Sequence, residues 1–152
     1  MIAIGSDHAG FFLKNSIIRY FKEEGMDYID FGPDSDDSVD FPDYAEKTAV
    51  SVATGQSERG ILICGTGIGM SIAANKVPGI RAALCTTIYH ARLSRQHNNA
   101  NILALGARTT GSGLAIAIVK EWLETEYLDG RYELRNQKIR RLEEKSARRI
   151  DK

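Results

Sequence analysis

A cysteine followed at once by a glycine-rich loop is the feature of this sequence best suited to chemistry. Cys64 ends the apolar run 60–64, and residues 65–69 read Gly-Thr-Gly-Ile-Gly. Glycines at alternate positions let backbone amides converge on an anion, and a helix beginning just after them adds partial positive charge. Both effects favour the thiolate, the reactive form of cysteine. The pattern predicts an anion-binding loop beside a reactive cysteine, while a tight turn beside an inert cysteine is the alternative.

The loop matches neither of two common nucleotide-binding fingerprints. The dinucleotide pattern Gly-x-Gly-x-x-Gly requires glycine where Met70 stands, and the P-loop requires a closing Gly-Lys-Ser/Thr that this segment lacks. Cys85 follows another apolar run but has no glycine loop after it, so we expect it to be structural.

Further polar residues follow predicted strands or end a predicted helix. Asp7 and His8 follow the first strand, and Arg108 follows the last one. Because ligands of open α/β sheets bind beyond the carboxyl ends of the strands, we expect these residues near Cys64. His97 lies at the end of a predicted helix, where a lone histidine is more often solvated than catalytic.

The sequence predicts no metal site. The three histidines and two cysteines lack the short spacing of zinc ligands. The acidic segment 34–43 lacks the central glycine and the closing glutamate of a calcium loop.

The last segment, 131–152, carries nine Lys or Arg and four Asp or Glu. Arg131 and Arg135 are four residues apart, hence on one helical face, and paired arginines suit bidentate binding of phosphate. A solvated basic helix is the alternative. The apolar positions of segment 131–152 are few and include Ile139, Leu142 and Ile150. Such a narrow stripe is typical of a helix that docks on a partner.

Composition bounds the class of protein. The chain has 152 residues, with 20 basic and 20 acidic side chains, so a chain-wide polycation for wrapping nucleic acid is excluded. The length suits a single domain, 1–152. Two cysteines make no disulfide framework, the start has no signal-peptide pattern, and no apolar run approaches a bilayer span. We expect a cytoplasmic protein.

Strand-like apolar runs alternate with segments of helical periodicity. The predicted strands are 2–5, 28–31, 60–64, 80–85 and 102–105. The predicted helices begin near 13, 45, 69, 86 and 114 and end near 25, 55, 76, 96 and 127. This order predicts an α/β fold: a three-layer α/β/α sandwich around a five-stranded parallel, Rossmann-like sheet with right-handed crossovers.

Five segments, taken together and in collinear order, resemble the ribose-5-phosphate isomerase B family, which includes allose- and galactose-6-phosphate isomerases. They are 5–10 (GSDHAG), 63–69 (ICGTGIG), 73–82 (AANKVPGIRA), 94–98 (SRQHN) and 101–106 (NILALG). The resemblance runs from residue 1 to about residue 144. It implies aldose–ketose isomerisation of a sugar phosphate through an enediolate, with no metal or organic cofactor.

The resemblance also implies roles for residues. Cys64 would be the base that moves a proton between carbons 1 and 2, and His97, with Asp7 and Thr66 nearby, would open the furanose ring. The loop amides would hold the enediolate oxygens. The implied substrate-binding residues are Asp7, His8, Tyr44, Gly65, Thr66, Gly67, Ile68, Gly69, Ser71, Asn98, Arg108, Arg131 and Arg135.

Within the family each site is built from both subunits of a homodimer, with a tetramer as the larger assembly, so the resemblance implies that segment 131–152 docks on a partner. One branch uses a glutamate base just after the glycine loop, where this chain has Met70. Two positions depart from the family pattern: Ser6 replaces a frequent cysteine, and Tyr132 replaces a frequent histidine.

Three functions stay open at this point. Isomerisation of ribose 5-phosphate is the leading one, which the presence of His97 favours, and a hexose-phosphate isomerase is the second. A nucleotide- or RNA-binding regulatory module would use the loop and the basic segment, and would show salt-sensitive binding. It gives no reason for Cys64, His97 and the loop to occur together.

Overall fold

The computed structural model describes the backbone of residues 1–150 and the side chains of residues 1–147. The strands are β1 (Ile2–Ser6), β2 (Tyr28–Asp30), β3 (Arg59–Cys64), β4 (Ala82–Leu84) and β5 (Ile102–Gly106). The helices are the short 3-10 helix η1 (His8–Gly10), α1 (Phe11–Glu23), α2 (Phe41–Ala53), α3 (Ile68–Ala74), α4 (Ile88–Asn98), α5 (Ser112–Glu124) and α6 (Arg131–Ile150). The predicted alternation of strands and helices is confirmed.

All five strands are parallel and pair in the order β2-β1-β3-β5-β4. The predicted parallel sheet is therefore confirmed. Because β3 and β5 lie inside the sheet, their side chains are buried on both faces, and their sequences show no polar alternation. The carboxyl ends of β3 and β5 meet at one edge, where Cys64 pairs with Gly106.

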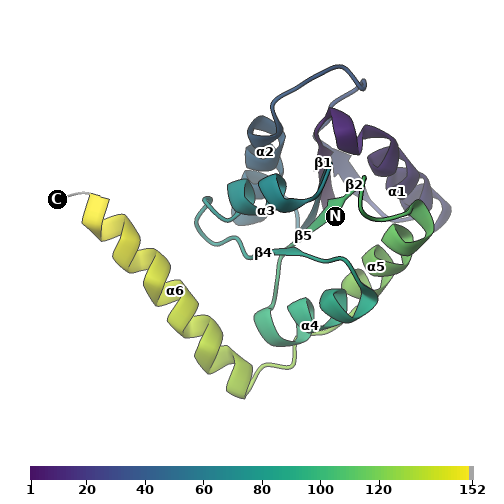
Figure 1. The fold of residues 1–152 in the computed structure, drawn as a ribbon. Helices are drawn as coiled ribbons and strands as arrows, with labels where there is room; N and C mark the ends of the chain where they lie inside the picture. Colours follow the sequence, from purple (N-terminus) through teal and green to yellow (C-terminus); the bar gives the residue numbers. More distant parts are fainter. Residues whose placement is uncertain (151–152) are drawn as a thin grey trace.

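Helices cover both faces of the sheet (Figure 1). Side chains of α1, α4 and α5 pack on one face, with Trp122 and Phe21 fully buried, and those of α2 and α3 pack on the other. Successive residues of a strand face opposite sides. Ile63 accordingly faces the first layer and Cys64 the α2–α3 layer.

Several elements are shorter than, or shifted from, the predicted ranges. β4 covers Ala82–Leu84 rather than 80–85, and in the turn before it Asn75 bonds both main-chain groups of Ala82 at 2.9 Å. The same turn ends α3 at Ala74, two residues early. α2 begins at Phe41 rather than near 45, with Pro42 in its first turn.

α6 extends away from the sheet as an arm, at the yellow end of the chain (Figure 1). Leu134, Ile139 and Leu142 are 65%, 44% and 64% exposed. Ile150 lies outside the residues whose side chains are described, and 151–152 lie outside the described residues altogether. Docking of this segment on a partner stays a prediction.

None of the helices in the described residues combines the length and the apolar composition that crossing a bilayer requires.

Candidate active site

Cys64 lies at the carboxyl end of the central strand β3, directly before the glycine loop. It is 6% exposed, and its Sγ accepts a hydrogen bond from the Gly67 amide at 3.1 Å. A backbone N–H aimed at sulfur stabilises negative charge there. α3, which begins one residue after Gly67, spans only seven residues.

Gly67 can only be glycine in this loop. Its φ is +78°, and a Cβ built there would lie 2.5 Å from Leu84 Cδ1 and 2.9 Å from the Leu105 carbonyl carbon. Only glycine allows the loop to press against the ends of β4 and β5 while turning its amide toward the sulfur. The backbone of the loop is therefore rigidly placed by the sheet beneath it.

The rest of the loop faces outward. Thr66 is exposed, and its Oγ1 accepts from the Ile68 amide at 3.3 Å. Ser71 is half-buried on α3, and its amide donates to the Gly67 carbonyl at 3.0 Å. A Cβ on Gly69 would lie 3.0 Å from the Phe41 ring, so glycine lets the start of α2 approach the loop.

Asp7, His8 and Tyr44 come from neighbouring elements at the same edge. The Asp7 amide donates to the Ile63 carbonyl at 3.0 Å, one residue before the cysteine, and its buried carboxylate accepts from the Gly10 amide at 2.9 Å. His8 Nδ1 lies 3.3 Å from both main-chain polar atoms of Val39. Tyr44 is half-buried on α2.

Arg108 completes this edge. Its amide donates to the Gly65 carbonyl at 2.9 Å, and its side chain extends over Gly65, 3.5 Å from where a Cβ would stand. The guanidinium is exposed above the loop. We call the residues assembled here the carboxyl-edge group: Asp7, His8, Tyr44, Cys64, Gly65, Thr66, Gly67, Ile68, Gly69, Ser71 and Arg108.

His97, Asn98, Arg131 and Arg135 form a second set, the amino-edge group. α4 starts beyond the carboxyl end of β4 and runs antiparallel to it. The last residues of α4 therefore lie near the amino end of β4. Arg81, which precedes β4, donates from Nε to the Asn98 carbonyl at 3.0 Å. A five-residue strand spans roughly 17 Å, so within one chain the two groups lie at opposite edges of the sheet. The chain alone therefore does not bring His97 beside Asp7 and Thr66.

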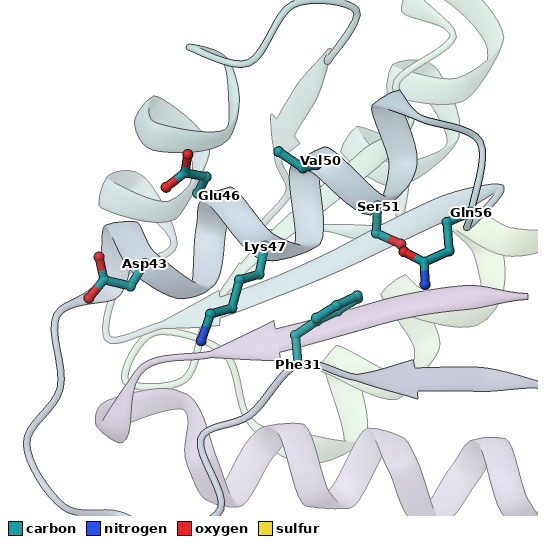
Figure 2. Close-up of a pocket in the computed structure, with 7 residues that line it drawn as sticks. All are labelled: Phe31, Asp43, Glu46, Lys47, Val50, Ser51 and Gln56. Carbon is teal, nitrogen blue, oxygen red and sulfur yellow. The ribbon is translucent and has the colours of Figure 1, made fainter.

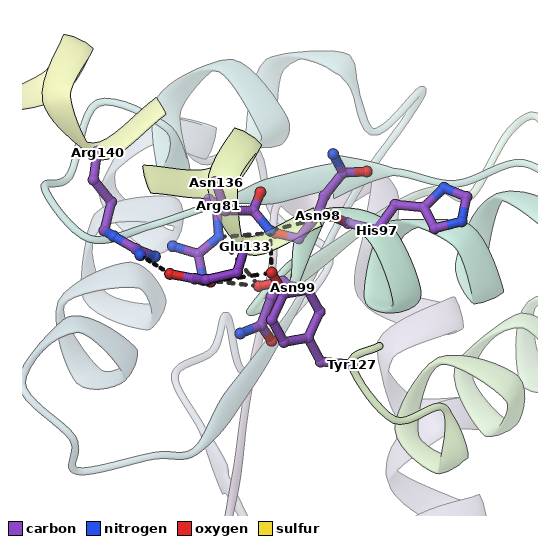
Figure 3. A network of polar contacts seen from close by, with 8 residues as sticks. All are labelled: Arg81, His97, Asn98, Asn99, Tyr127, Glu133, Asn136 and Arg140. Carbon is purple, nitrogen blue, oxygen red and sulfur yellow. Dashed lines mark hydrogen bonds and ion pairs between the residues drawn. The ribbon is translucent and has the colours of Figure 1, made fainter. Parts of the chain in front are cut away.

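Polar contacts hold the start of α6 on the end of α4 (Figure 3). Asn136, only 1% exposed, donates from Nδ2 to the His97 carbonyl at 3.1 Å and to Tyr127 Oη at 2.8 Å. Tyr127 donates in turn to Glu133 at 3.1 Å, and Arg140, hydrogen-bonded to Glu133, lowers the pKa of that carboxyl. Sequence reasoning missed Asn136; the only available signal was a neutral amide in a strongly charged helix.

Cys85 directly follows β4, on the same edge as Cys64, but its sulfur receives no amide hydrogen bond from the described residues. It is 1% exposed, and burial raises its pKa to about 11 despite a contact with Ser94. The thiol is protonated and enclosed at neutral pH, in line with the predicted structural role.

Three surface hollows lie away from Cys64. One, of about 540 Å³, is lined by side chains of α2, by Gln56 after it and by Phe31 of the segment after β2, and its charged residues Asp43, Glu46 and Lys47 are exposed (Figure 2). The second, of about 930 Å³, lies between α6 and the segment 75–82, and the third, of about 330 Å³, lies near Met1. Among the described residues, no cluster of three or more His, Cys, Asp or Glu side chains is placed to hold a metal ion.

Comparison with known proteins finds relatives that match nearly the whole chain. The sequence model of the Ribose/Galactose Isomerase family matches residues 2–139. The ribose-5-phosphate isomerase B of Escherichia coli (strain K12) is 49% identical over 144 residues, which cover 95% of this chain and 97% of that protein.

Solved structures agree over nearly the whole chain. The ribose-5-phosphate isomerase B of Clostridium thermocellum superposes with a TM-score of 0.94 at 54% identity, covering 95% of this chain and 98% of that one. The ribose-5-phosphate isomerase B of Mycoplasma genitalium, solved with bound ribulose 5-phosphate, superposes with a TM-score of 0.90 at 41% identity, covering 94% and 95%.

Proposed function

The chain belongs to the ribose/galactose isomerase family, and from that premise we propose that it interconverts D-ribose 5-phosphate and D-ribulose 5-phosphate. The observation that carries the proposal is the 3.1 Å contact between the Gly67 amide and Cys64 Sγ at the carboxyl end of β3. It places the candidate base directly beside a loop of main-chain amides. Two relatives named ribose-5-phosphate isomerase B are 49% and 54% identical to this chain in sequence.

Cys64 is the base. Its thiolate takes the proton from carbon 2 of the open-chain aldose, and the electron pair of that C–H bond forms the carbon 1–carbon 2 double bond of the enediolate. The proton returns from sulfur to carbon 1, while the hydroxyl proton moves from oxygen 2 to oxygen 1. The ketose results with no net change in protons or electrons. One branch of the family has a glutamate base just after the glycine loop. This chain has Met70 there, and its thioether cannot act as a base.

The loop amides hold the oxygens. A proton beside a carbonyl is too weakly acidic for a thiolate unless the developing oxyanion is stabilised at once, and each well-placed donor is worth roughly 3 kcal/mol of barrier. Residues 65–69 present amides next to the sulfur, and Gly67 fixes their direction. Thr66 and Ser71 add hydroxyls at the rim.

The amino-edge group handles the rest of the substrate. His97, with Asp7 and Thr66 across the site, opens the furanose ring by moving the proton between the ring oxygen and the carbon 1 hydroxyl. Asn98 binds sugar hydroxyls, and His8, Arg108, Arg131 and Arg135 hold the phosphate. Because the two groups lie at opposite edges of one chain, the amino-edge group of one subunit completes the carboxyl-edge group of its partner.

Exposed apolar side chains flank both groups and support a homodimer. Ile68 and Ile72 on α3 are 52% and 59% exposed beside the loop, and Leu134 on α6 is 65% exposed beside the arginines. In a two-fold dimer the α3 patch of each subunit contacts the α6 patch of the other. Both patches are then covered on both subunits, and two equal sites form. The single domain, the cytoplasmic location and a tetramer as the larger assembly stay predictions.

A substrate survey tests the function. Isomerisation is assayed with EDTA present on ribose 5-phosphate, allose 6-phosphate and galactose 6-phosphate. We expect the highest kcat/KM on ribose 5-phosphate. A roughly hundredfold preference for a hexose phosphate, about 2.7 kcal/mol in favour of the larger sugar, would assign the chain to the hexose branch instead.

A further inference from the structure

Tyr132 stacks on His97, and no role implied for the site accounts for that contact. The two ring centroids are 4.1 Å apart and the planes differ by 10°. Both side chains are half-buried, one at the end of α4 and the other in the first turn of α6. Stacking restricts rotation of the imidazole about its side-chain bonds, so the direction of its ring nitrogens depends on the tyrosine.

Contacts other than the stack itself fix the segments that carry the two rings. Asn136, one turn after Tyr132, is buried and bonds the His97 carbonyl at 3.1 Å. The Tyr132 amide donates to the Asp129 carbonyl at 3.1 Å. The backbones that carry the two rings are thus tied together independently of the rings themselves.

The same tyrosine touches both arginines of the amino-edge group. Arg131 donates from Nη2 to Tyr132 Oη at 2.8 Å, and its guanidinium carbon lies 4.9 Å from the ring centroid. The guanidinium carbon of Arg135 lies 5.7 Å from that centroid. Among the side chains of residues 1–147, no carboxylate forms an ion pair with either arginine. The Tyr132 ring therefore holds the guanidinium groups of Arg131 and Arg135 close together, and both can bind an anion.

We propose that Tyr132 is a positioning residue that aligns ring opening with phosphate binding: its ring sets the plane of the His97 imidazole, and its hydroxyl sets the Arg131 guanidinium. The inference rests on the proposed function, since it assigns the tyrosine a role in that reaction. The two parts of the side chain have separable tasks. The stack serves turnover of a cyclic substrate, and the hydroxyl serves substrate affinity.

Two substitutions separate the tasks. Tyr132→Phe keeps the ring and removes the hydroxyl, so KM for ribose 5-phosphate should rise about fivefold with kcat within twofold, the size expected for the net loss of one ordinary hydrogen bond. Tyr132→Leu removes the ring, so kcat should also fall about tenfold through misplacement of the imidazole. Tyr89→Leu, which changes an exposed tyrosine on the same helix as His97, is the matched control and should leave both constants unchanged.

A spectroscopic readout makes the test independent of turnover. In protein labelled at its three histidines, the His97 ring protons, assigned with His97→Asn, should be shifted upfield by the tyrosine ring. The shift should persist in Tyr132→Phe and vanish in Tyr132→Leu.

An unshifted His97 signal in the unsubstituted protein, or unchanged kcat and KM in Tyr132→Leu, would overturn the inference. So would equal effects of the two substitutions, which would mean that the ring contributes nothing beyond the hydroxyl. Absence of isomerase activity in the unsubstituted protein, with the upfield shift present, would instead reject the proposed function.

Discussion

The two halves of the candidate site are built by different means. The carboxyl-edge group rests on the main chain: Cys64 ends a buried strand, and the Gly67 amide is aimed at it by a loop pressed between two other strands. The amino-edge group rests on side chains at the ends of two helices, joined by Asn136 and a ring stack. The first half is as rigid as the core, whereas the second depends on how α6 is docked. In the proposed reaction, proton transfer between carbons 1 and 2 belongs to the rigid half, and ring opening belongs to the adjustable one.

The largest effect should come from the rigid half. Cys64→Ala removes the proposed base while a buried methyl group keeps the packing, so kcat should fall by about a thousandfold, in the range for loss of a general base. Binding of a sugar phosphate, followed by calorimetry, should persist. Cys85→Ala is the matched control and should keep turnover within twofold. Near-normal turnover of Cys64→Ala would move the base elsewhere.

The adjustable half should show substrate-dependent effects. His97→Asn should lower kcat/KM on ribose 5-phosphate about a hundredfold, the size expected for a lost proton-transfer group. Erythrose 4-phosphate cannot close a five-membered ring, because its terminal hydroxyl is esterified, so the same variant should lose little on that aldose. Equal losses on the two substrates would remove ring opening from the role of His97.

A pair of glycine substitutions tests the rigidity of the loop. Gly67 and Gly79 both have positive φ, +78° and +83°, but of the two only Gly67 has atoms within 4 Å of the position that a Cβ would take. Gly79→Ala should cost about 1 kcal/mol of unfolding free energy from backbone strain alone. Gly67→Ala should cost about 2 kcal/mol more, because core atoms must shift, and should also lower kcat. Urea unfolding of both variants gives the comparison; equal costs would show that the loop is not fixed by the sheet.

The smallest effect is on the pH dependence of stability and comes from Cys85, which lies at the same edge of the sheet as Cys64. Burial raises the pKa of Cys85 from 9.0 to about 11, so the folded state keeps its thiol proton when the unfolded state loses it. Below pH 9 both states are protonated and nothing changes. Between pH 9 and 11 the unfolded state ionises first, so stability falls with rising pH, by about 1 kcal/mol at pH 10. Cys85→Ala should lack this extra loss in urea unfolding at pH 8 and pH 10; an identical loss in the variant would contradict it.

The sequence was most informative where periodicity and glycine patterns act locally. Strand β3 and the loop after it could be located because an apolar run without alternation stops at a segment of glycines. The short β4 could not be predicted, because its extent is set by pairing with β5, which only folding brings beside it. The position of His97 relative to Cys64 depends on the direction in which α4 runs and, in the proposed dimer, on how two subunits meet. The stack with Tyr132 has no sequence signal, because ring orientation follows from the docking of α6.

Hybrid dimers test most directly whether the site is shared between subunits. Cys64→Ala and His97→Asn chains, carrying different affinity tags, are co-expressed, and the mixed dimer is purified through both tags. One of its two sites is intact if the halves come from different chains, so it should show about half of the unsubstituted activity. A dimer of an unsubstituted chain with a doubly substituted one should then be inactive. The reverse result, an inactive first hybrid and a half-active second one, would show that each chain carries a complete site.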